Sequence, residues 1–375
     1  MRLEQSEKTG RTAMNDASCG NAKLGHVWRE FCEELAQAGD VLMREEAPGA
    51  AIDQAEGLRY LSRLTRTALN MLVDSADPDF PRLFLLCDDK IKIGADNPDN
   101  LYQQCVVSAD REYRITGKRN TVPYFSIGSK ANRYATDGTM ASTGEIEFAD
   151  MEFGPDGSFK IVVSKDEKPG NWLPMSDDTS LLIVRQTFDD KKTQVPADVR
   201  IERIGPGPET PLVLRPEQIE SQLKGAAQWV RGTANTFADW SEWFKAQPNR
   251  IYDGDQAVFY RAGGDPNIWY GHIYFDLQPG EALVIRATPP ECRMWNFQLD
   301  NWWMESLDHV NNPHVWINGS MARYEPDGSV IVVCADTDPG FANWIDLAGH
   351  REGTGLWRWL GAKDHPVPQV EVVRL

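Results

Sequence analysis

The chain has 375 residues, and its 39 Lys and Arg against 56 Asp and Glu give a net charge of −17. This length exceeds what one hydrophobic core usually serves, so we expect two or three structural units. The acidic balance argues against nucleic acid and anionic membrane surfaces as partners, because both are bound by clustered Lys and Arg. The sequence contains no run of about 18 apolar residues, so we expect no bilayer span.

The six cysteines, at positions 19, 32, 87, 105, 292 and 334, are scattered and form no Cys-x-x-Cys pair. In a chain of this size they are typical of reduced core residues, because disulfide frames and zinc sites use regular spacings. The N-terminus lacks the apolar stretch of a secretory signal. We therefore expect a cytoplasmic protein.

The N-terminal region, residues 1–81, is predicted to hold a tail and two helices. Residues 1–24 are polar and lack periodicity, which predicts a loose tail. Apolar residues then recur at helical spacing over 26–46 and over 54–75, which predicts two amphipathic helices. The prolines of the following Asp-Pro-Asp-Phe-Pro run forbid further helix.

The rest of the chain alternates between strands and one helical segment. Over 82–215, short apolar or alternating runs are split by Gly, Pro, Asn and Asp, as in Phe159–Val163, which predicts a β unit. Helical spacing returns over 216–249, where Pro216 suits a first helical position. Strand patterns resume over 250–375, which predicts a second β unit.

The two strand-rich regions repeat each other. Matching elements keep their order at offsets of about 168 to 173 residues, which chance rarely gives. The pairs are Asn97…Tyr102 with Asp265…Tyr270, Pro155-Asp-Gly-Ser158 with Pro326-Asp-Gly-Ser329, Asn171-Trp172 with Asn343-Trp344, and Arg185 with Arg358. Asp-Gly between strand-like flanks is a strong hairpin signal. We infer a duplicated sandwich or jelly-roll unit of antiparallel strands.

Tryptophan gathers in the second half, where 11 of the 13 lie from Trp229 onward. The densest stretch, 294–316, mixes aromatic residues with Asn, Asp, Glu and His. Apolar walls with a few polar groups are what a ligand cavity needs. A Trp-rich core with a polar surface loop is an equally good interpretation, because aromatic residues dominate cores as well as sites.

No sequence motif indicates a metal or a nucleotide cofactor. The chain has no His-x-His, Glu-x-x-His or His-Glu-x-x-His, no Walker loop and no Gly-x-Ser-x-Gly. We expect neither a metal site nor a cofactor. Acid–base groups remain, since a His or carboxylate beside Trp can have a shifted pKa and move protons near neutral pH.

Candidate site residues follow from this pocket hypothesis. For proton transfer they are His309, His314, Asp300, Glu305 and Asp308. For holding a substrate they are Trp302, Trp303, Trp316, Asn301, Asn343, Arg358 and His350. For each acid–base candidate taken alone, a structural or solvated role is the stronger interpretation.

Arg358 lies between Trp357 and Trp359 in a segment of period two. Its side chain should point opposite to both tryptophans. If it faces a cavity, it could hold a carboxylate or phenolate through two hydrogen bonds. Arg185 offers the same choice in the first repeat, and a stabilising ion pair is the alternative for both.

The tail Asp338–Trp359 is similar to the signature of a bacterial family known as domain of unknown function 1214, with Asn343-Trp344, Gly349-His350 and Trp357-Arg358-Trp359 in the same order. The stretch Phe125–Arg203 resembles the upstream part of the same proteins. The resemblance implies a β-sandwich related to viral jelly rolls. It supplies no catalytic residues.

The sequence thus predicts a mainly β protein of two tandem jelly-roll-like units, with N-terminal helices and a helical connector. We hypothesise a cofactor-independent lyase, hydrolase or isomerase that acts on a small aromatic or apolar molecule in a Trp-lined pocket. A carbohydrate-binding protein and a structural or assembly protein are the alternatives. The expected partner is a small-molecule ligand, and a homo-oligomer is compatible with the sequence.

Overall fold

The computed structural model describes residues 24–375, so the predicted tail lies almost wholly outside the described residues. Both predicted N-terminal helices are present, one over 24–38 and the other as α2 (Ala51–Leu69). The first passes into the 3-10 helix η1 (Gly39–Met43), and α2 runs into the π-helical turn η2 (Asn70–Asp74). In both N-terminal helices the regular α-helix therefore ends before the predicted last residue, because the final turns are 3-10 or π-helical.

The first β unit is a sandwich of two four-stranded sheets, with strand orders β1-β7-β3-β4 and β6-β5-β2-β8. Neighbouring strands run antiparallel, except that β6 pairs in parallel with β5. The strands are β1 (Asn100–Val106), β2 (Glu112–Lys118), β3 (Tyr124–Arg133), β4 (Thr139–Glu147), β5 (Ser158–Ser164), β6 (Trp172–Pro174), β7 (Leu181–Thr187) and β8 (Asp198–Ile204). The short η3 (Phe148–Asp150) follows β4.

The second β unit has the same architecture, with sheet orders β12-β11-β15-β9 and β14-β13-β10-β16. Its parallel pair is β13 with β14. The strands are β9 (Ile268–Asp276), β10 (Glu281–Ala287), β11 (Met294–Leu299), β12 (Trp316–Asn318), β13 (Val330–Ala335), β14 (Trp344–Asp346), β15 (Glu352–Leu360) and β16 (Gln369–Arg374).

The duplication predicted from the sequence is confirmed strand by strand. Each strand of the second unit takes the sheet position of the strand eight places earlier in the chain, including the short parallel strands that begin at Trp172 and Trp344. The repeated Asp-Gly turns precede β5 and β13. Their glycines, Gly157 and Gly328, have φ of 79° and 84°, a conformation that glycine adopts without steric cost.

Each sandwich encloses its own apolar core. The first core contains Tyr113 and Phe125 from opposite sheets. The second is richer in tryptophan, and the rings of Trp295 and Trp357 stack with their centroids 5.0 Å apart. The alternation of inward and outward residues along the strands therefore agrees with the two-layer architecture.

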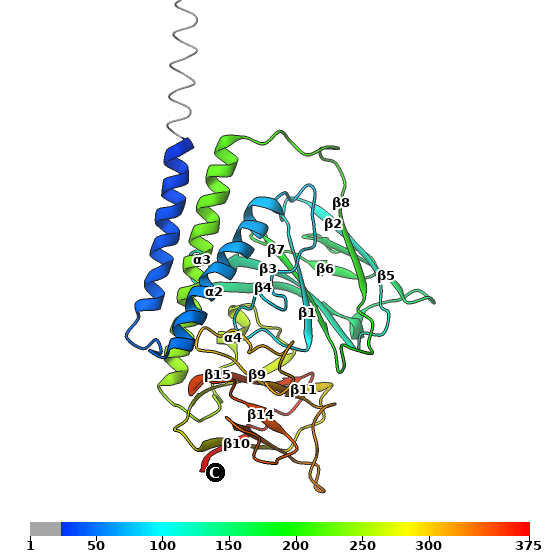
Figure 1. The fold of residues 1–375 in the computed structure, drawn as a ribbon. Helices are drawn as coiled ribbons and strands as arrows, with labels where there is room; N and C mark the ends of the chain where they lie inside the picture. The colour runs from blue at the N-terminus through cyan, green and yellow to red at the C-terminus, as the bar shows by residue number, and fades with distance from the viewer. Residues whose placement is uncertain (1–23) are drawn as a thin grey trace, which may run out of the picture.

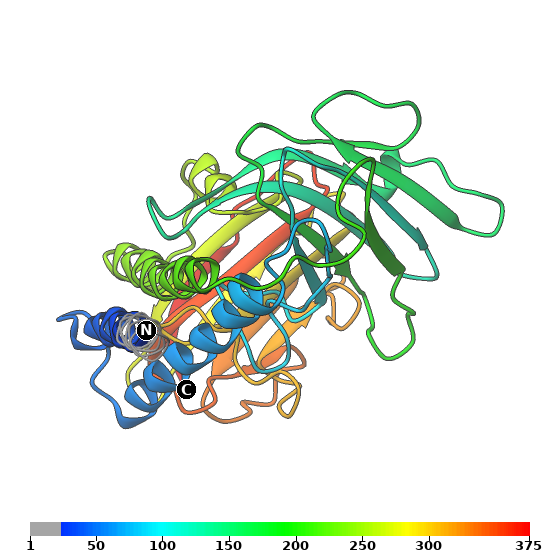
Figure 2. The ribbon, with the colours of Figure 1, turned by 90° about the horizontal axis from the view of Figure 1, so that it is seen from above.

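Helices and the facing sheets of the two units form a further core. The connector α3 (Pro216–Lys245) packs beside α2 and against β9 and β15, and the short α4 (Ala257–Arg261) follows it. Figure 1 shows α3 running past the first unit and down to the second, and Figure 2 shows the helices gathered on one side of the sheets. None of the described helices has the length and apolar character to cross a bilayer.

Candidate functional site

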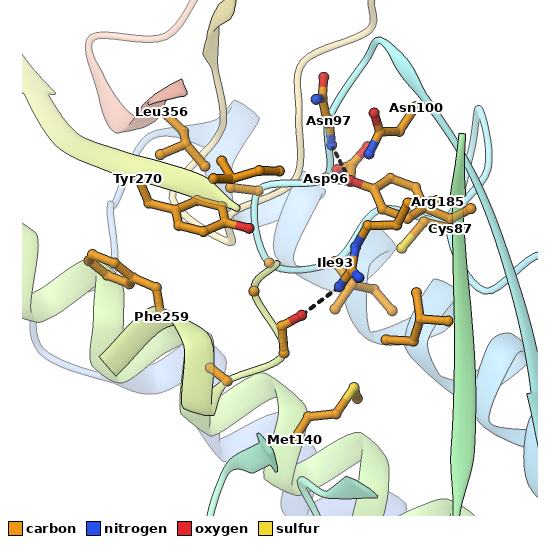
Figure 3. Close-up of a pocket in the computed structure, with 18 of the residues that line it drawn as sticks. Cys87, Ile93, Asp96, Asn97, Asn100, Met140, Arg185, Phe259, Tyr270 and Leu356 are labelled. Carbon is orange, nitrogen blue, oxygen red and sulfur yellow. Dashed lines mark hydrogen bonds between the residues drawn. The ribbon is translucent and has the colours of Figure 1, made fainter. Parts of the chain in front are cut away.

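A cavity of about 140 Å³ lies where the two β units meet. Its walls come from β1 and β7 of the first unit, from β9 and β15 of the second, and from α3 and α4 (Figure 3). The loops that precede β1 and β9 complete it. The cavity therefore belongs to neither unit alone.

Strand alternation brings one arginine from each unit to this cavity. Trp357 and Trp359 point into the second sandwich core, so Arg358 projects from the opposite face of β15, as the sequence predicts. The other unit covers that face, and Arg358 is only 5% exposed. Arg185 takes the equivalent position on β7 and is buried as well.

The two arginines reach across the boundary between the units in a reciprocal way. Arg358 Nη2 donates a hydrogen bond to the carbonyl oxygen of Ala95, in the loop before β1. Arg185 Nη2 donates to the carbonyl oxygen of Gly263, in the loop before β9, at 2.5 Å. Ala95 and Gly263 both have positive φ, 56° and 103°. Each leading loop is thus fastened by the arginine of the other unit.

Two equivalent tyrosines brace these loops within their own units. The Tyr102 hydroxyl accepts a hydrogen bond from the Asn97 backbone N–H at 3.1 Å, and the Tyr270 hydroxyl accepts one from the Asp265 N–H at 2.7 Å. Asn97 then crosses to the second unit, where its Oδ1 accepts from Asn296 Nδ2 at 2.6 Å. The loops are therefore built as a matched pair.

The charge around the two arginines differs. Arg185 lies beside two carboxylates: Glu145 Oε1 is 3.6 Å from its Nη1, and Asp265 is nearby. Burial opposes the Arg185 charge, but these two groups outweigh it and raise the pKa of Arg185. Arg358 instead donates to the neutral Gln298 Oε1 at 2.6 Å, and it forms no ion pair within residues 24–375. Of the two, Arg358 is therefore the arginine without an ion pair to a described residue, although the buried Asp300 interacts with it electrostatically.

Polar atoms without partners also line the cavity. Asn100 Oδ1, Gln104 Oε1, Arg185 Nη1 and His272 Nδ1 are buried and make no hydrogen bond to any described residue. Burial, and then the charge of Arg358, hold the pKa of His272 well below its usual range, so the ring is neutral at pH 7. Buried polar groups are normally paired, and a set of unpaired ones around one cavity is typical of a ligand site.

The remaining wall is apolar. Met140, Phe237, Trp240, Phe259 and Leu356 line it, and Figure 3 shows Phe259 and Met140 on the side away from Asn97. The cavity is thus lined by guanidinium groups, amide oxygens and the Asp96 residue, together with rings and aliphatic chains. Such a surface suits a small molecule with one anionic group and an apolar body.

Among the residues predicted for the site, Arg358 alone lines this cavity. Trp302 and Trp303 are buried in the packing of the helices instead, with their ring centroids 4.6 Å apart. Trp303 also stacks on Tyr60 and donates from Nε1 to the Asp53 carbonyl at 3.0 Å. Trp303 thus holds the second β unit to α2, and the Trp302 carbonyl accepts a hydrogen bond from Ser241 of α3 at 2.5 Å.

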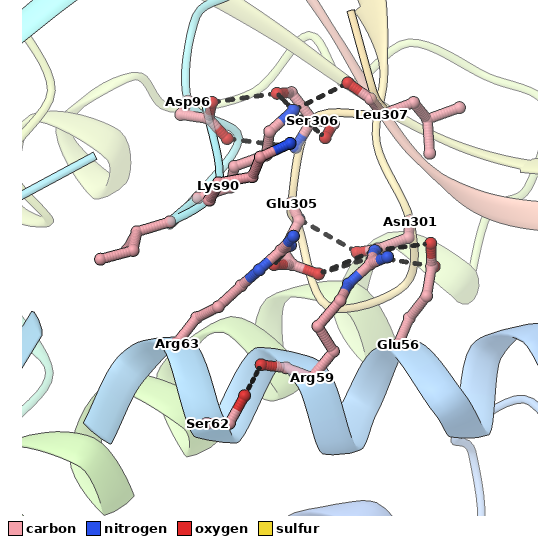
Figure 4. Close-up of polar contacts among 12 residues, drawn as sticks. Glu56, Arg59, Ser62, Arg63, Lys90, Asp96, Asn301, Glu305, Ser306 and Leu307 are labelled. Carbon is pink, nitrogen blue, oxygen red and sulfur yellow. Dashed lines mark hydrogen bonds and ion pairs between the residues drawn. The ribbon is translucent and has the colours of Figure 1, made fainter. Parts of the chain in front are cut away.

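Asn301 and Glu305 form part of a buried polar network with α2 (Figure 4). Asn301 Nδ2 donates to Glu56 Oε2 at 2.9 Å and to Glu305 Oε2 at 3.0 Å. Arg63 pairs with Glu305 at 2.6 Å, and Arg59 pairs with Glu56 at 2.9 Å. Both predicted residues therefore connect the loop after β11 to the helix.

His309 borders a separate hollow of about 390 Å³. Its Nδ1 lies 3.1 Å from Lys92 Nζ, and its ring centroid lies 5.6 Å from that of Trp316. Burial and the Lys92 charge lower the pKa of His309 to about 4. Asp308 is exposed and accepts a hydrogen bond from Asn311 Nδ2 at 2.8 Å.

The other predicted residues lie apart from one another. His314 is exposed. Asp300 is fully buried, and its Oδ1 accepts from Gln298 Nε2 at 2.5 Å. Asn343 hydrogen-bonds three backbone groups, in the same way as Asn171 in the first unit. His350 is buried against α2.

Sequence reasoning missed His272, Gln104 and the tyrosines Tyr102 and Tyr270 as site residues. They are alternate residues of ordinary-looking strands, and no motif marks them. The repeat contained the usable signal, because it pairs the two tyrosines and the two arginines in the same order. All four of these paired residues line the cavity.

Comparison with known proteins places the chain without assigning an activity. The sequence profile described as "Protein of unknown function (DUF1214)" matches residues 102–189. The crystal structure of an uncharacterized protein from Burkholderia cenocepacia is 45% identical, covers 93% of this chain and 97% of its own, and has a TM-score of 0.91.

A Vibrio parahaemolyticus protein structure covers 85% of this chain and 98% of its own at 11% identity, with a TM-score of 0.48. No curated protein matches the chain. The profile match falls on β1–β7 of the first unit, and the Burkholderia protein matches both units together with the helices. The chain therefore belongs to the DUF1214 family of proteins of unknown function.

Proposed function

We propose that the protein binds a small organic anion in the cavity between its β units. Arg358 carries this proposal, because it is a buried cation whose hydrogen bonds go to neutral acceptors. Removing a charge from water costs several kcal/mol unless an opposite charge offsets it. A carboxylate at Arg358 would supply that charge, and Arg185 Nη1, which lies 3.6 Å from Glu145 Oε1 but makes no hydrogen bond to any described residue, would supply a second donor.

The size of the cavity limits the ligand. An apolar cavity of about 150 Å³ accommodates a benzene ring, and this one measures about 140 Å³. A compound of the size of benzoate or of a short branched carboxylic acid fits that volume. Its ring or chain would contact Phe259 and Met140.

For a cofactor-independent acid–base enzyme, His272 is the best candidate for the residue that transfers the proton. Its ring is neutral, its Nδ1 lacks a partner among the described residues, and Arg358 is close enough to affect its pKa. We propose that it accepts a proton from a ligand carbon or hydroxyl and returns it, as an isomerase or lyase requires. Such proton transfer contributes roughly 10²–10⁴-fold to a rate. His309 is the rival for this role, since it borders the other hollow.

The binding proposal is tested by calorimetry and thermal shift with benzoate, short branched carboxylates and their neutral amides. We expect the acids to bind and the amides to fail. Arg358→Met should weaken binding by about tenfold or more, since a charge-assisted hydrogen bond contributes about 1.5–3 kcal/mol. Arg185→Met should weaken it less, because Glu145 and Asp265 already neutralise that arginine.

Arg286→Met is the matched control, since Arg286 lies on β10 and pairs with Glu371 at the surface. It should leave affinity unchanged. Amides that bind as tightly as acids, or an unaffected Arg358→Met, would contradict the proposal, and binding of sugars alone would favour the carbohydrate alternative. For any bound acid, proton exchange followed by NMR should be lost in His272→Gln and kept in His309→Gln.

We also propose the cytoplasm as the location of the protein. The single buried thiols of Cys105 and Cys334 suit a reducing compartment. Fractionation of cells with an antibody to the protein tests this, and recovery in an envelope fraction would contradict it.

A further inference from the structure

We infer that Asp53, Glu56 and His350 form a binding site for one divalent transition-metal ion. One ligand atom from each residue lies within 4.8 Å of the other two. Metal–ligand bonds of about 2.0–2.2 Å place ligand atoms roughly 3–4 Å apart. The three side chains are therefore close enough to hold one ion, once the Glu56 carboxylate and the His350 imidazole move slightly apart from their 2.9 Å hydrogen bond.

The local fold explains why these residues meet. Asp53 and Glu56 are three positions apart on α2, so they project from the same face of the helix. His350 arrives from the turn between β14 and β15, where Ala348 and Gly349 both have positive φ, 50° and 89°. The site joins the N-terminal helix to the second β unit.

The imidazole of His350 is oriented as in metal centres. Its Nδ1 lies 3.0 Å from the Leu347 carbonyl oxygen, to which an N–H at that position donates. Its Nε2 hydrogen-bonds Glu56 Oε2 at 2.9 Å, a contact that a bound ion would replace. A backbone carbonyl that holds one ring nitrogen while the other faces the ligand point is the usual support of a metal-bound histidine.

Asp53 provides an independent sign that something is bound. It is 3% exposed, its Oδ1 makes no hydrogen bond to any described residue, and it forms no ion pair within residues 24–375. The neighbouring carboxylates are different, since Glu56 pairs with Arg59 and Glu305 pairs with Arg63. Among these three carboxylates, Asp53 is the one with no arginine partner; His350 acts on it electrostatically without an ion pair, and a divalent cation would give it a direct ionic contact.

The donor set indicates the class of ion. One imidazole and two carboxylates suit Zn²⁺, Fe²⁺ or Mn²⁺ better than Ca²⁺ or Mg²⁺, which prefer oxygen ligands alone. No motif marks such a site in the sequence, because its ligands come from positions nearly 300 residues apart. The inference is independent of the anion proposed for the cavity.

Metal content of the chelator-stripped full chain, re-equilibrated with Zn²⁺ or Co²⁺ and desalted, tests the inference. We expect about one ion per chain by mass spectrometry, and a Co²⁺ absorption spectrum typical of a site with a histidine ligand. His350→Ala and Asp53→Asn should each weaken binding at least tenfold. Asp53→Asn keeps the size of the side chain and removes an unpaired buried charge, so it should fold.

His314→Ala is the control, because His314 is an exposed histidine of the same β unit. It should bind Co²⁺ with wild-type affinity. If Asp53→Asn binds the same amount of Co²⁺ with the same affinity and spectrum as the wild type, the site does not exist as inferred. Absence of stoichiometric binding by the wild type would overturn the inference equally.

Discussion

The two β units share an architecture and differ in the charges they present to each other. Lys130 of β3 occupies the position that corresponds to Asp300 beyond β11, and Gln104 of β1 corresponds to His272 of β9. The first unit balances its buried charges internally, since Lys130 pairs with Glu145 at 2.8 Å. The second unit keeps an unpaired Arg358 and a neutral histidine. The two units thus share their frame and differ in how their buried charges are paired.

The largest expected effect comes from a substitution in the loop before β1, where this loop packs against α3. A Cβ at Gly94 would collide with the Phe237 ring, and Gly94 has φ of 63°. Gly94→Ala should therefore lower the free energy of unfolding by about 2–4 kcal/mol, from backbone strain and overpacking together. Urea denaturation measures this.

Gly280→Ala is the matched control, since Gly280 has φ of 80° and open space around it. It should cost only the strain of the backbone, about 1 kcal/mol. Equal losses in the two variants would show that contact between the loop and α3 adds nothing to stability.

The next effect, which accumulates over several pH units to a size comparable with the first, sharpens the contrast in charge. Burial raises the pKa of Asp300 to about 8, while an unfolded chain has an ordinary aspartate. Between these values the folded state binds the extra proton, so this contribution to stability is present below pH 4 and falls as the pH rises toward 8. The loss is up to about 1.4 kcal/mol per pH unit.

Asp300→Asn removes that titration. Its free energy of unfolding relative to wild type should therefore rise between pH 5 and pH 8, as measured by urea denaturation at each pH. A difference that stays constant over this range would mean that Asp300 is already ionised in the folded protein.

The smallest expected effect concerns a turn that the two units have in common. Gly157 and Gly328 occupy the repeated turns, have nearly the same φ and meet no side chain closer than 4.0 Å when a Cβ is added. Replacing either by Ala should cost about 1 kcal/mol, and the two losses should agree. Thermal unfolding of both variants would reveal any inequality, which would mean that the two sandwiches differ in local stability.

Much of the fold could be predicted from the sequence because the repeat and the period-two patterns are local signals. The Asp-Gly turns, the connector from Pro216 and the opposite facing of Arg358 and its tryptophan neighbours followed directly. The candidate site did not follow. Tryptophan density at Trp302 and Trp303 marks helix packing, and sequence alone does not distinguish such packing from a pocket. The cavity arises only when two units face each other, which no local pattern records.

The hydrogen bond that holds the loop before β1 affects when this loop can become ordered during synthesis. Arg358, which holds the Ala95 carbonyl, is 263 residues further along the chain. A growing chain can complete the first sandwich core early, yet this contact must wait until β15 has left the ribosome. Contacts of such long sequence separation form late, because closing the intervening chain costs entropy. A polypeptide that ends before Arg358 would therefore lack the hydrogen bond that holds the loop before β1. We expect cellular proteases to cleave such a chain first at this loop.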